Sequence, residues 1–205
     1  MQVNSFGIYL QDQIAVFDNL KFLVGGRFDT YHSEEQNFLN DSTTVTDSDA
    51  FSPRVGVVYQ PTKEISLFAN YSRSFVPVSC TSKNGDAFVP TRGTGYEVGI
   101  KGDFLNGRLS STLAFYTVTK TNVLTADPSD PTNTFSIQVG EQRARGIEFD
   151  IAGEILAGWN VIASYAYTDT EITQNNTYPV GNTLGGIPRH SGSLWTTNTV
   201  VRFCE

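Results

Sequence analysis

Six charged side chains stand inside otherwise apolar segments of this 205-residue sequence: Arg27, Arg54, Glu97, Lys101, Glu148 and Asp150. In the segment RGIEFDIAGEI, residues 145–155, charged and apolar residues alternate. Successive side chains of a β-strand point to opposite faces, so this alternation predicts strands with one apolar face and one charged face. The charged side chains can contact water or a complementary polar surface, or they can pair with one another. We expect them to face water or a polar protein surface.

The other titratable residues lack the spacing that catalysis or metal binding requires. His32 and His190 are single histidines with no ligand cluster and no nucleophile motif beside them. The acidic segments 47–49 and 127–130 carry the carboxylates that calcium prefers, but not the spacing of a calcium loop. GTGYEVG at 93–99 does not match a dinucleotide-binding loop, and no phosphate-binding GxxxxGK(S/T) loop occurs. We therefore expect no enzyme activity, no metal site and no cofactor.

The composition argues against several further kinds of function and of membrane segment. The formal net charge is -7 and no basic patch is visible, which argues against nucleic acid because phosphate binding needs clustered Lys and Arg. Cys80 and Cys204 lack the spacing of a zinc or redox site, and a disulfide between them is the less favoured alternative to free thiols. No apolar run is long enough for a transmembrane helix, and MQVNSFGIYL lacks the regions of a secretory signal.

Alternating apolar residues and turn residues predict about nine strands. They cover approximately residues 5–17, 20–32, 51–60, 63–74, 95–105, 108–121, 135–156, 159–169 and 190–203. The short connections FDNL, QPTKE, FLNGR and LAGW contain the residues that tight hairpins use. They alternate with long connections near residues 34–49, 75–94, 122–134 and 170–189. This arrangement predicts long antiparallel hairpins with short turns at one end and long loops at the other.

The two faces of these strands differ in polarity. The apolar face is predicted to contain Phe22, Val24, Phe28, Val55, Val57, Tyr59, Tyr96, Val98, Ile100, Leu109, Leu113, Phe115, Trp159, Val161, Ala163, Tyr165 and Tyr167. The opposite face carries the six charged residues together with Asp29, Ser110, Thr112, Tyr116, Asn160 and Ser164. Tyr and Trp settle at lipid–water boundaries, so two aromatic girdles are expected. One contains Phe17, Tyr59 and Trp159 near the short turns, and the other contains Tyr31, Phe51, Tyr71, Tyr96, Tyr116 and Tyr167 near the loops.

These features predict an all-β protein that forms an antiparallel portion of a transmembrane β-barrel, with short periplasmic turns and long external loops. The apolar face would contact lipid and the polar face would line the lumen. A soluble β-sandwich also alternates apolar and polar residues and is the other possibility. Sandwich strands usually have about five or six residues, whereas the predicted strands reach the roughly 9 to 11 residues that cross a membrane. Strand length therefore favours the barrel and a location in an outer membrane.

Several segments, in their order along the chain, resemble the siderophore class of TonB-dependent outer-membrane receptors. They are FGIYLQDQI from residue 6, FSPRVGVVYQP from 51, ISLFANYSRSFVP from 65, YEVGIKGDFLNGRLSSTLAFYTVTKTNV from 96, RARGIEFDIAGEILAGWNVIASYAYTDTEI from 143 and IPRHSGSLWT from 187. Each segment alone is little more than an amphipathic strand. Their combination is specific, and the resemblance covers nearly all of the chain.

The resemblance implies import of a ferric siderophore, of the ferrichrome or hydroxamate type, through a barrel of about 22 strands that holds an N-terminal plug. The TonB complex of the inner membrane would supply the energy by acting on the plug. The complete receptor would be a monomeric barrel surrounded by outer-membrane lipid. The six charged residues would face the plug, with pairing among themselves as the alternative. In the long loops, Phe75, Phe88 and Tyr178 are the candidate ligand contacts, with packing within the loops as the favoured role of each.

The sequence differs from the family pattern in its extent. Residues 1–205 would form a partial barrel domain, without the plug, the segment that contacts TonB or the terminal strands. An open sheet would leave backbone N–H and C=O groups unpaired at membrane depth, where each costs several kcal/mol. We therefore expect a fragment of a larger receptor that does not persist alone in a bilayer as an open sheet. A surface binding module or adhesin on a smaller barrel, without transport, is the alternative function.

Overall fold

The computed structural model describes residues 2–37, 41–132 and 134–199, which form nine β-strands. The strands are β1 (Gln2–Phe17), β2 (Leu20–Asn37), β3 (Ser42–Tyr59), β4 (Ile65–Val76), β5 (Thr91–Phe104), β6 (Leu109–Ala126), β7 (Ser136–Leu156), β8 (Trp159–Gln174) and β9 (His190–Asn198). Each strand pairs antiparallel with the next, so the sheet order is the chain order. The predicted all-β class is confirmed. In the part of the chain that the structure describes, no helix could span a bilayer.

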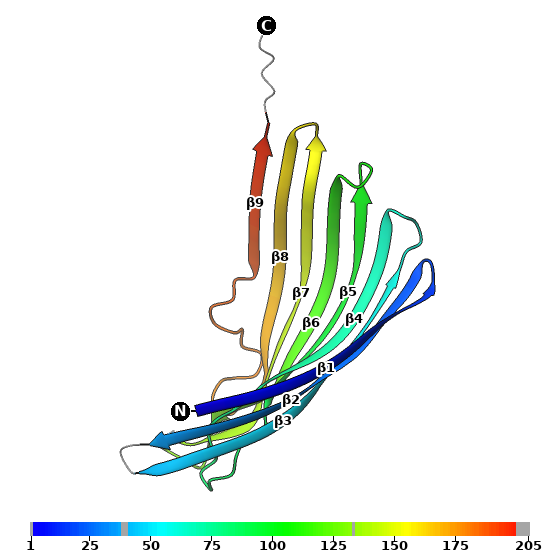
Figure 1. Ribbon diagram of the computed structural model, residues 1–205. Coiled ribbons are helices and arrows are strands. Elements are labelled where there is room, and N and C mark those ends of the chain that lie inside the picture. The colour runs from blue at the N-terminus through cyan, green and yellow to red at the C-terminus, as the bar shows by residue number, and fades with distance from the viewer. Residues whose placement is uncertain (1, 38–40, 133, 200–205) are drawn as a thin grey trace.

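The sheet is a curved wall (Figure 1), in which β1–β3 fold across the front of the later strands. The turns at 18–19, 60–64, 105–108 and 157–158 follow one edge of the wall in Figure 1, from the β7–β8 turn at the top to the β1–β2 turn at the right. The longer connections lie at the opposite end, as the sequence predicted. Leu105, Asn106 and Gly107 all have positive φ values, which lets four residues reverse the chain between β5 and β6. The wall therefore has a short-turn end and a loop end.

The cross-strand register assigns every row of side chains to one face. One row contains Ile14, Phe22, Val57, Ala69, Val98, Phe115, Ile147 and Tyr167. A neighbouring row on the other face contains Leu23, Gly56, Asn70, Glu97, Tyr116, Gly146 and Thr168. The first row begins near the short-turn end of β1 and reaches the loop-side half of β8, as expected for the tilted strands of a barrel wall. We call the face of the first row the convex face and that of the second row the concave face.

The prediction of the aromatic girdle near the loops is wrong for two tyrosines. Tyr31 and Tyr116 lie in rows of the concave face, where their partners include Ser48 and Gly146. The Tyr31 hydroxyl lies 3.4 Å from the Ser79 hydroxyl in the β4–β5 loop. A position near a strand end does not by itself place an aromatic residue in the girdle, because successive residues of a strand face opposite sides of the sheet.

Several strands extend farther towards the loop end than predicted. β2 and β3 remain paired as far as Asn37 and Ser42, although residues 34–49 were expected to form a loop. The segment from Thr43 to Thr46 is rich in β-branched residues, which favour an extended backbone even outside a membrane. The strands expected to end at 121 and 169 continue to Ala126 and Gln174. The last predicted strand, 190–203, ends at Asn198; residues 200–203 and Cys204 lie outside the described residues.

Aromatic rings on the concave face lie across glycines of the neighbouring strand. A Cβ atom at Gly99 would meet the Phe68 ring, and one at Gly146 would meet the Tyr116 ring. Crossing Gly146 brings the Tyr116 hydroxyl within 2.8 Å of the Thr168 hydroxyl on β8. The absence of a side chain at these glycines therefore lets a ring cover the sheet surface and link strands beyond its direct neighbour.

Asp130 organises the β6–β7 loop. Its carboxylate accepts hydrogen bonds from the backbone N–H groups of Thr132 at 3.0 Å, Thr134 at 2.8 Å and Phe135 at 2.8 Å. The Thr132 hydroxyl also donates to this carboxylate, and Asp130 is only 7% exposed. The Thr132 hydroxyl, followed by the backbone N–H groups, lowers the pKa of Asp130 from 3.8 to about 2.

Loop order is therefore expected to depend on the Asp130 carboxylate. Because the pKa is lowered in the folded loop, the stabilisation is fully present above about pH 4 and is lost as the pH falls towards 2. Asp130→Ala should increase amide hydrogen exchange of residues 127–132 at pH 7, while the β8–β9 loop is an internal control that should not change. Equal exchange in the variant and the unmodified chain would contradict this role.

Candidate functional site

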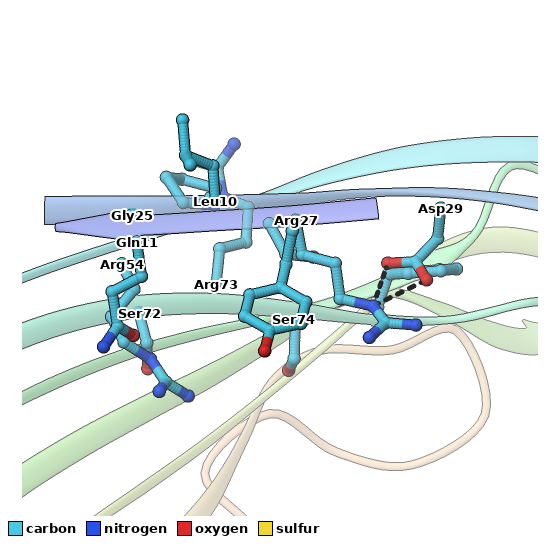
Figure 2. Close-up of a pocket in the computed structure, with 14 residues that line it drawn as sticks. Leu10, Gln11, Gly25, Arg27, Asp29, Arg54, Ser72, Arg73 and Ser74 are labelled. Atoms are coloured by element: carbon cyan, nitrogen blue, oxygen red, sulfur yellow. Dashed lines mark hydrogen bonds and ion pairs between the residues drawn. The ribbon is translucent and has the colours of Figure 1, made fainter. Parts of the chain in front are cut away.

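The concave face of β1–β4 carries a polar hollow of about 430 Å³. We call it the arginine hollow, because Arg27 and Arg54 line it together with Tyr9, Gln11, Ser52, Ser72 and Ser74. Arg73 borders it as well, but its pairing with Thr94 places it in a row of the convex face. In Figure 2 the side chains of Arg27, Arg54 and Asp29 extend from the sheet towards the space that the wall encloses. The hollow therefore combines two guanidinium groups with several hydroxyl groups on the face that the sequence predicted to line a lumen.

Gly25 makes room for this hollow. It pairs with Gln11 on one side and Arg54 on the other. A Cβ atom at Gly25 would lie 2.9 Å from the Leu10 carbonyl oxygen and 3.1 Å from the Gln11 Cβ. A larger residue at this position would crowd the backbone of β1 and fill the floor between the two arginines.

The two arginines differ in their partners. The Arg27 Nε donates to both oxygens of Asp29, at 2.7 and 2.9 Å. Asp29 is nearly covered, with a side chain 13% exposed, whereas that of Arg27 is 54% exposed and keeps its terminal nitrogens available. Arg54 takes part in none of the ion pairs among the described residues. The hollow therefore has an excess positive charge and guanidinium donors that can bind a carboxylate or another oxyanion.

Acidic side chains occupy the concave face farther along the wall. Glu97 and Glu148 line one hollow of about 330 Å³ with Tyr116, and the Asn70 amide donates to Glu97 at 2.9 Å. Glu148 and Asp150 line the next hollow, of about 370 Å³. The wall is thus positive at β2 and β3 and negative at β5 and β7, so it can bind a surface that carries both charges.

The structure places all six predicted charged residues in rows of the concave face. Arg27 and Arg54 meet in the arginine hollow, and Glu97, Glu148 and Asp150 lie in the acidic hollows. Lys101 lies nearer the short-turn end, with its Nζ 3.8 Å from Asp103. Whether these residues contact a plug stays a prediction.

The three aromatic residues predicted to contact ligand are not gathered in one hollow. Phe75 lies in β4 rather than in a loop, and its pairing with Arg92 places it in a row of the convex face, so its predicted loop position is wrong. It borders the arginine hollow, whereas Phe88 and Tyr178 do not. Phe88 is half-buried in the β4–β5 loop, next to Val89, whose backbone exchanges two hydrogen bonds with the Gln138 side chain. Tyr178 is exposed in the β8–β9 loop. Their contact with a ligand stays a prediction too.

The polar residues that β1 and β4 contribute to the arginine hollow were not predicted as site residues from the sequence. Tyr9 and Gln11 alternate with Ile8 and Leu10, and Ser72 and Ser74 stand at alternate positions of β4. The same period-two reading that identified Arg27 could have identified these residues. What it could not show is that they surround the same hollow, because that depends on the register of four strands.

Comparisons with known proteins agree with this architecture. The family model "TonB dependent receptor-like, beta-barrel" matches residues 1–201. The metal-pseudopaline receptor of Pseudomonas aeruginosa strain UCBPP-PA14 is 40% identical over 199 residues, which is 94% of this chain and 28% of the relative. The ferrichrome outer membrane transporter/phage receptor of Escherichia coli K12 is 40% identical over 193 residues, 94% of this chain and 25% of the relative.

Solved structures share the curved wall. The crystal structure of the siderophore receptor PiuA from Acinetobacter baumannii superimposes with a TM-score of 0.86 at 28% identity, covering 97% of this chain and 31% of that one. The ferripyoverdine receptor of the Pseudomonas aeruginosa outer membrane gives 0.82 at 27% identity, covering 98% and 26%. The chain thus spans about a quarter to a third of the proteins it matches, and its place is the outer membrane of a Gram-negative cell envelope. The chain belongs to the TonB-dependent receptor-like β-barrel family.

Proposed function

We propose that this sheet is part of the wall of an outer-membrane receptor that imports a ferric siderophore with energy from the TonB complex. The match to the receptor family over residues 1–201 carries the proposal. The names of relatives point to the cargo class, since two proteins 40% identical to the chain are named for ferrichrome and for metal-pseudopaline. Both cargoes are metal chelates, and the ferric siderophore is the member of this class that most of the compared receptors are named for.

The concave face has the chemistry that this role requires. A plug that fills the lumen needs a polar, charge-complementary wall, and the wall carries Arg27 and Arg54 on one side and Glu97 and Glu148 on the other. Phe75, Phe88 and Tyr178 are proposed to contact the chelate from the loop end. Residues 1–205 would then be one part of a barrel domain, and further strands of the complete receptor would pair with the edges of β1 and β9.

Uptake of radioactive iron tests the proposal directly. The receptor that contains this sheet is expressed in cells without other siderophore receptors, and iron is supplied as ferrichrome and as other ferric siderophores. We expect uptake of at least one chelate in cells that contain TonB and none in cells that lack it. Binding of a chelate or phage without TonB-dependent uptake would instead favour the surface binding module.

Removing the unpaired charge of the arginine hollow should slow uptake. A hydrogen bond that involves a charged group contributes about 1.5–3 kcal/mol, so Arg54→Gln is expected to reduce the uptake rate roughly tenfold. Lys63→Gln is the matched control, because it removes a positive charge from the exposed β3–β4 turn and should leave uptake unchanged. The amount of receptor in the outer membrane is measured for both. Unchanged uptake by the Arg54 variant would exclude a role for the arginine hollow in transport.

A further inference from the structure

Strand β3 is much longer than its pairing with β4. It begins at Ser42, but only Arg54–Tyr59 pair with β4. Its other edge stays paired with β2 along its whole length, and residues 73–76 of β4 pair only with β5. In Figure 1 the loop ends of β2 and β3 project to the lower left, beyond the loop ends of the later strands. Residues 42–53 of β3 therefore form a regular strand with one free edge, which we call the β3 edge.

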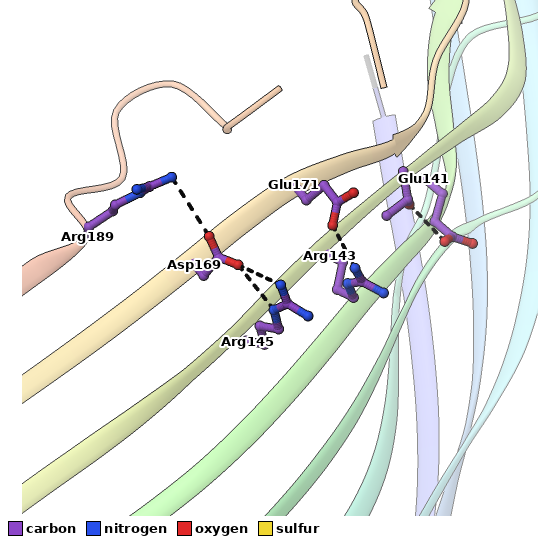
Figure 3. Close-up of polar contacts among 7 residues, drawn as sticks. Glu141, Arg143, Arg145, Asp169, Glu171 and Arg189 are labelled. Carbon is purple, nitrogen blue, oxygen red and sulfur yellow. Dashed lines mark hydrogen bonds and ion pairs between the residues drawn. The ribbon is translucent and has the colours of Figure 1, made fainter. Parts of the chain in front are cut away.

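The comparable end of β8 is covered by its own loop. β9 pairs with β8 only as far as Tyr167. Beyond that point the backbone N–H of Thr168 donates to the Arg189 carbonyl at 2.9 Å, and Figure 3 shows Arg189 beside β8. The backbone N–H of Ile172 donates to the Asn182 carbonyl at 2.8 Å. Among the described residues, no such backbone hydrogen bond joins the β4–β5 loop to the β3 edge. The β3 edge therefore lacks the cover that the fold gives to β8.

Two polar side-chain atoms beside the β3 edge lack partners. They are Ser48 Oγ in β3 and Arg73 Nε in β4, and within the described ranges they are the only buried side-chain nitrogen or oxygen atoms without a hydrogen bond. Arg73 follows Ser72, the last residue of β4 that pairs with β3. Pro53 would stand opposite Arg73 in the continued register, and it has no N–H to join the two strands. The sheet thus opens where partners for backbone and side-chain groups are missing.

The concave side of the β2–β3 hairpin is already covered. Ser33, Thr46 and Ala50 are buried in rows of this face. The Tyr31 hydroxyl lies 3.4 Å from the Ser79 hydroxyl of the β4–β5 loop on the same side. The ladder with β2 and this contact hold the β3 edge in an extended conformation. An edge that is already ordered loses little conformational entropy when a partner binds.

The outer part of the β3 edge stands beyond the lipid layer. On the convex face of β3 the apolar residues end at Phe51, and Asp49 and Asp47 follow at alternate positions. This change from apolar to charged residues marks the lipid boundary on β3. The loop end of barrels of this type faces the outside of the cell. Residues 43–49 are therefore accessible to a partner from outside.

The hairpin around this edge is acidic. Residues 30–52 contain no Lys or Arg. Their acids are Glu34, Glu35, Asp41, Asp47 and Asp49. Asp47 contacts His32 Nδ1 at 2.6 Å, yet its side chain is 74% exposed and keeps room for a second partner. The β3 edge therefore combines unpaired backbone groups with an excess of negative charge.

We propose that residues 43–49 of β3 bind an extended, basic peptide segment of another protein by strand addition. In this mode backbone hydrogen bonds supply affinity, and side chains at alternate positions supply specificity. Opposite charges directly across two strands attract, so the partner carries Lys or Arg opposite Asp47 and Asp49. Acids on a free edge repel acidic strands, and a second copy of this chain would place acids against acids. The interaction is separate from siderophore import and does not depend on it.

Binding of a synthetic peptide tests the proposal. The receptor that contains this sheet is titrated at neutral pH and physiological salt with fluorescent KTKTVTT, which places Lys opposite Asp49 and Asp47 in antiparallel register. We expect saturable binding, and none of ETETVTT. Asp47→Asn/Asp49→Asn should bind KTKTVTT about fivefold more weakly, because two cross-strand charge pairs are lost. Asp18→Asn/Glu64→Gln is the matched control, because it removes two exposed acids at the short-turn end and should bind normally.

Methylated peptides separate strand addition from simple charge attraction. N-methylation of alternate residues blocks the N–H donors on one edge of the peptide and leaves its charge unchanged. One of the two methylated peptides should lose binding while the other keeps it, because only one edge of the peptide faces β3. Bound KTKTVTT should also slow amide hydrogen exchange of residues 43–49.

Three outcomes would overturn the proposal. KTKTVTT does not bind in the first. In the second, both methylated peptides bind equally well, or binding leaves the exchange of residues 43–49 unchanged, so the acids attract the peptide without strand addition. In the third, these amides become protected without peptide as the receptor concentration rises, which would identify a second copy of the chain as the occupant of the β3 edge.

Discussion

Replacing Ile151 by arginine is expected to destabilise the inserted wall by about 2 to 4 kcal/mol. Ile151 stands on the convex face of β7, where it pairs with Ser111 and Ala163. Ala163 lies midway between Trp159 near the short turn and Tyr167, the last aromatic residue of the convex face of β8 before Asp169. The new guanidinium group would therefore lie near the middle of the hydrocarbon layer, where neither water nor headgroups can solvate it.

The same substitution on the other face provides the control. Ser164 lies on the concave face and lines a hollow with Asp150, Ser191 and Ser193. An arginine at 164 would point into this polar hollow opposite Asp150, so its effect on stability should stay below about 1 kcal/mol. Both variants are refolded into phosphatidylcholine vesicles and unfolded with urea, as parts of the receptor that contains this sheet. Equal destabilisation by the two variants would refute the assignment of faces.

The strand pattern could be predicted from sequence because the two faces of the wall meet different surroundings. In β7, three apolar residues alternate with Glu148 and Asp150, and only a strand separates these sets completely. The same alternation assigned Arg27, Arg54, Glu97 and Lys101 to the concave face, where the register places them. A period of two residues is a local property, so no knowledge of strand pairing is needed to detect it.

The hollows and the contacts between strands could not be predicted in this way. Tyr9, Arg27 and Ser72 come from three strands, and only the pairing of β1 to β4 brings them into one hollow. The ion pair of Arg145 with Asp169 likewise joins residues 24 positions apart in the sequence. Tyr31 and Tyr116 were assigned to a girdle because they stand near strand ends, but their rows face inwards. These features depend on the register between strands, and the alternation of residues within a single strand does not determine that register.

Gly153 should be the glycine of β7 that tolerates substitution least. Its φ is +140°, a conformation that residues with a Cβ rarely adopt. A Cβ atom there would also collide with the carbonyl oxygen of Arg108 and lie 2.8 Å from the Leu109 Cα. That carbonyl cannot move away easily, because it accepts a 2.9 Å hydrogen bond from the backbone N–H of Glu154. Gly153→Ala should therefore destabilise the wall by about 3 kcal/mol or more, as backbone strain and a steric clash act together.

Gly107→Ala separates the two causes. Gly107 lies in the adjacent β5–β6 turn with a φ of +80°, but a Cβ atom there would meet nothing within 4 Å. Only the strain term applies, so the expected cost is about 1 to 2 kcal/mol. Urea unfolding in vesicles should thus rank Gly153→Ala well above Gly107→Ala in destabilisation. Equal effects would mean that the backbone at Arg108 moves to accommodate the added methyl group, despite its hydrogen bond to Glu154.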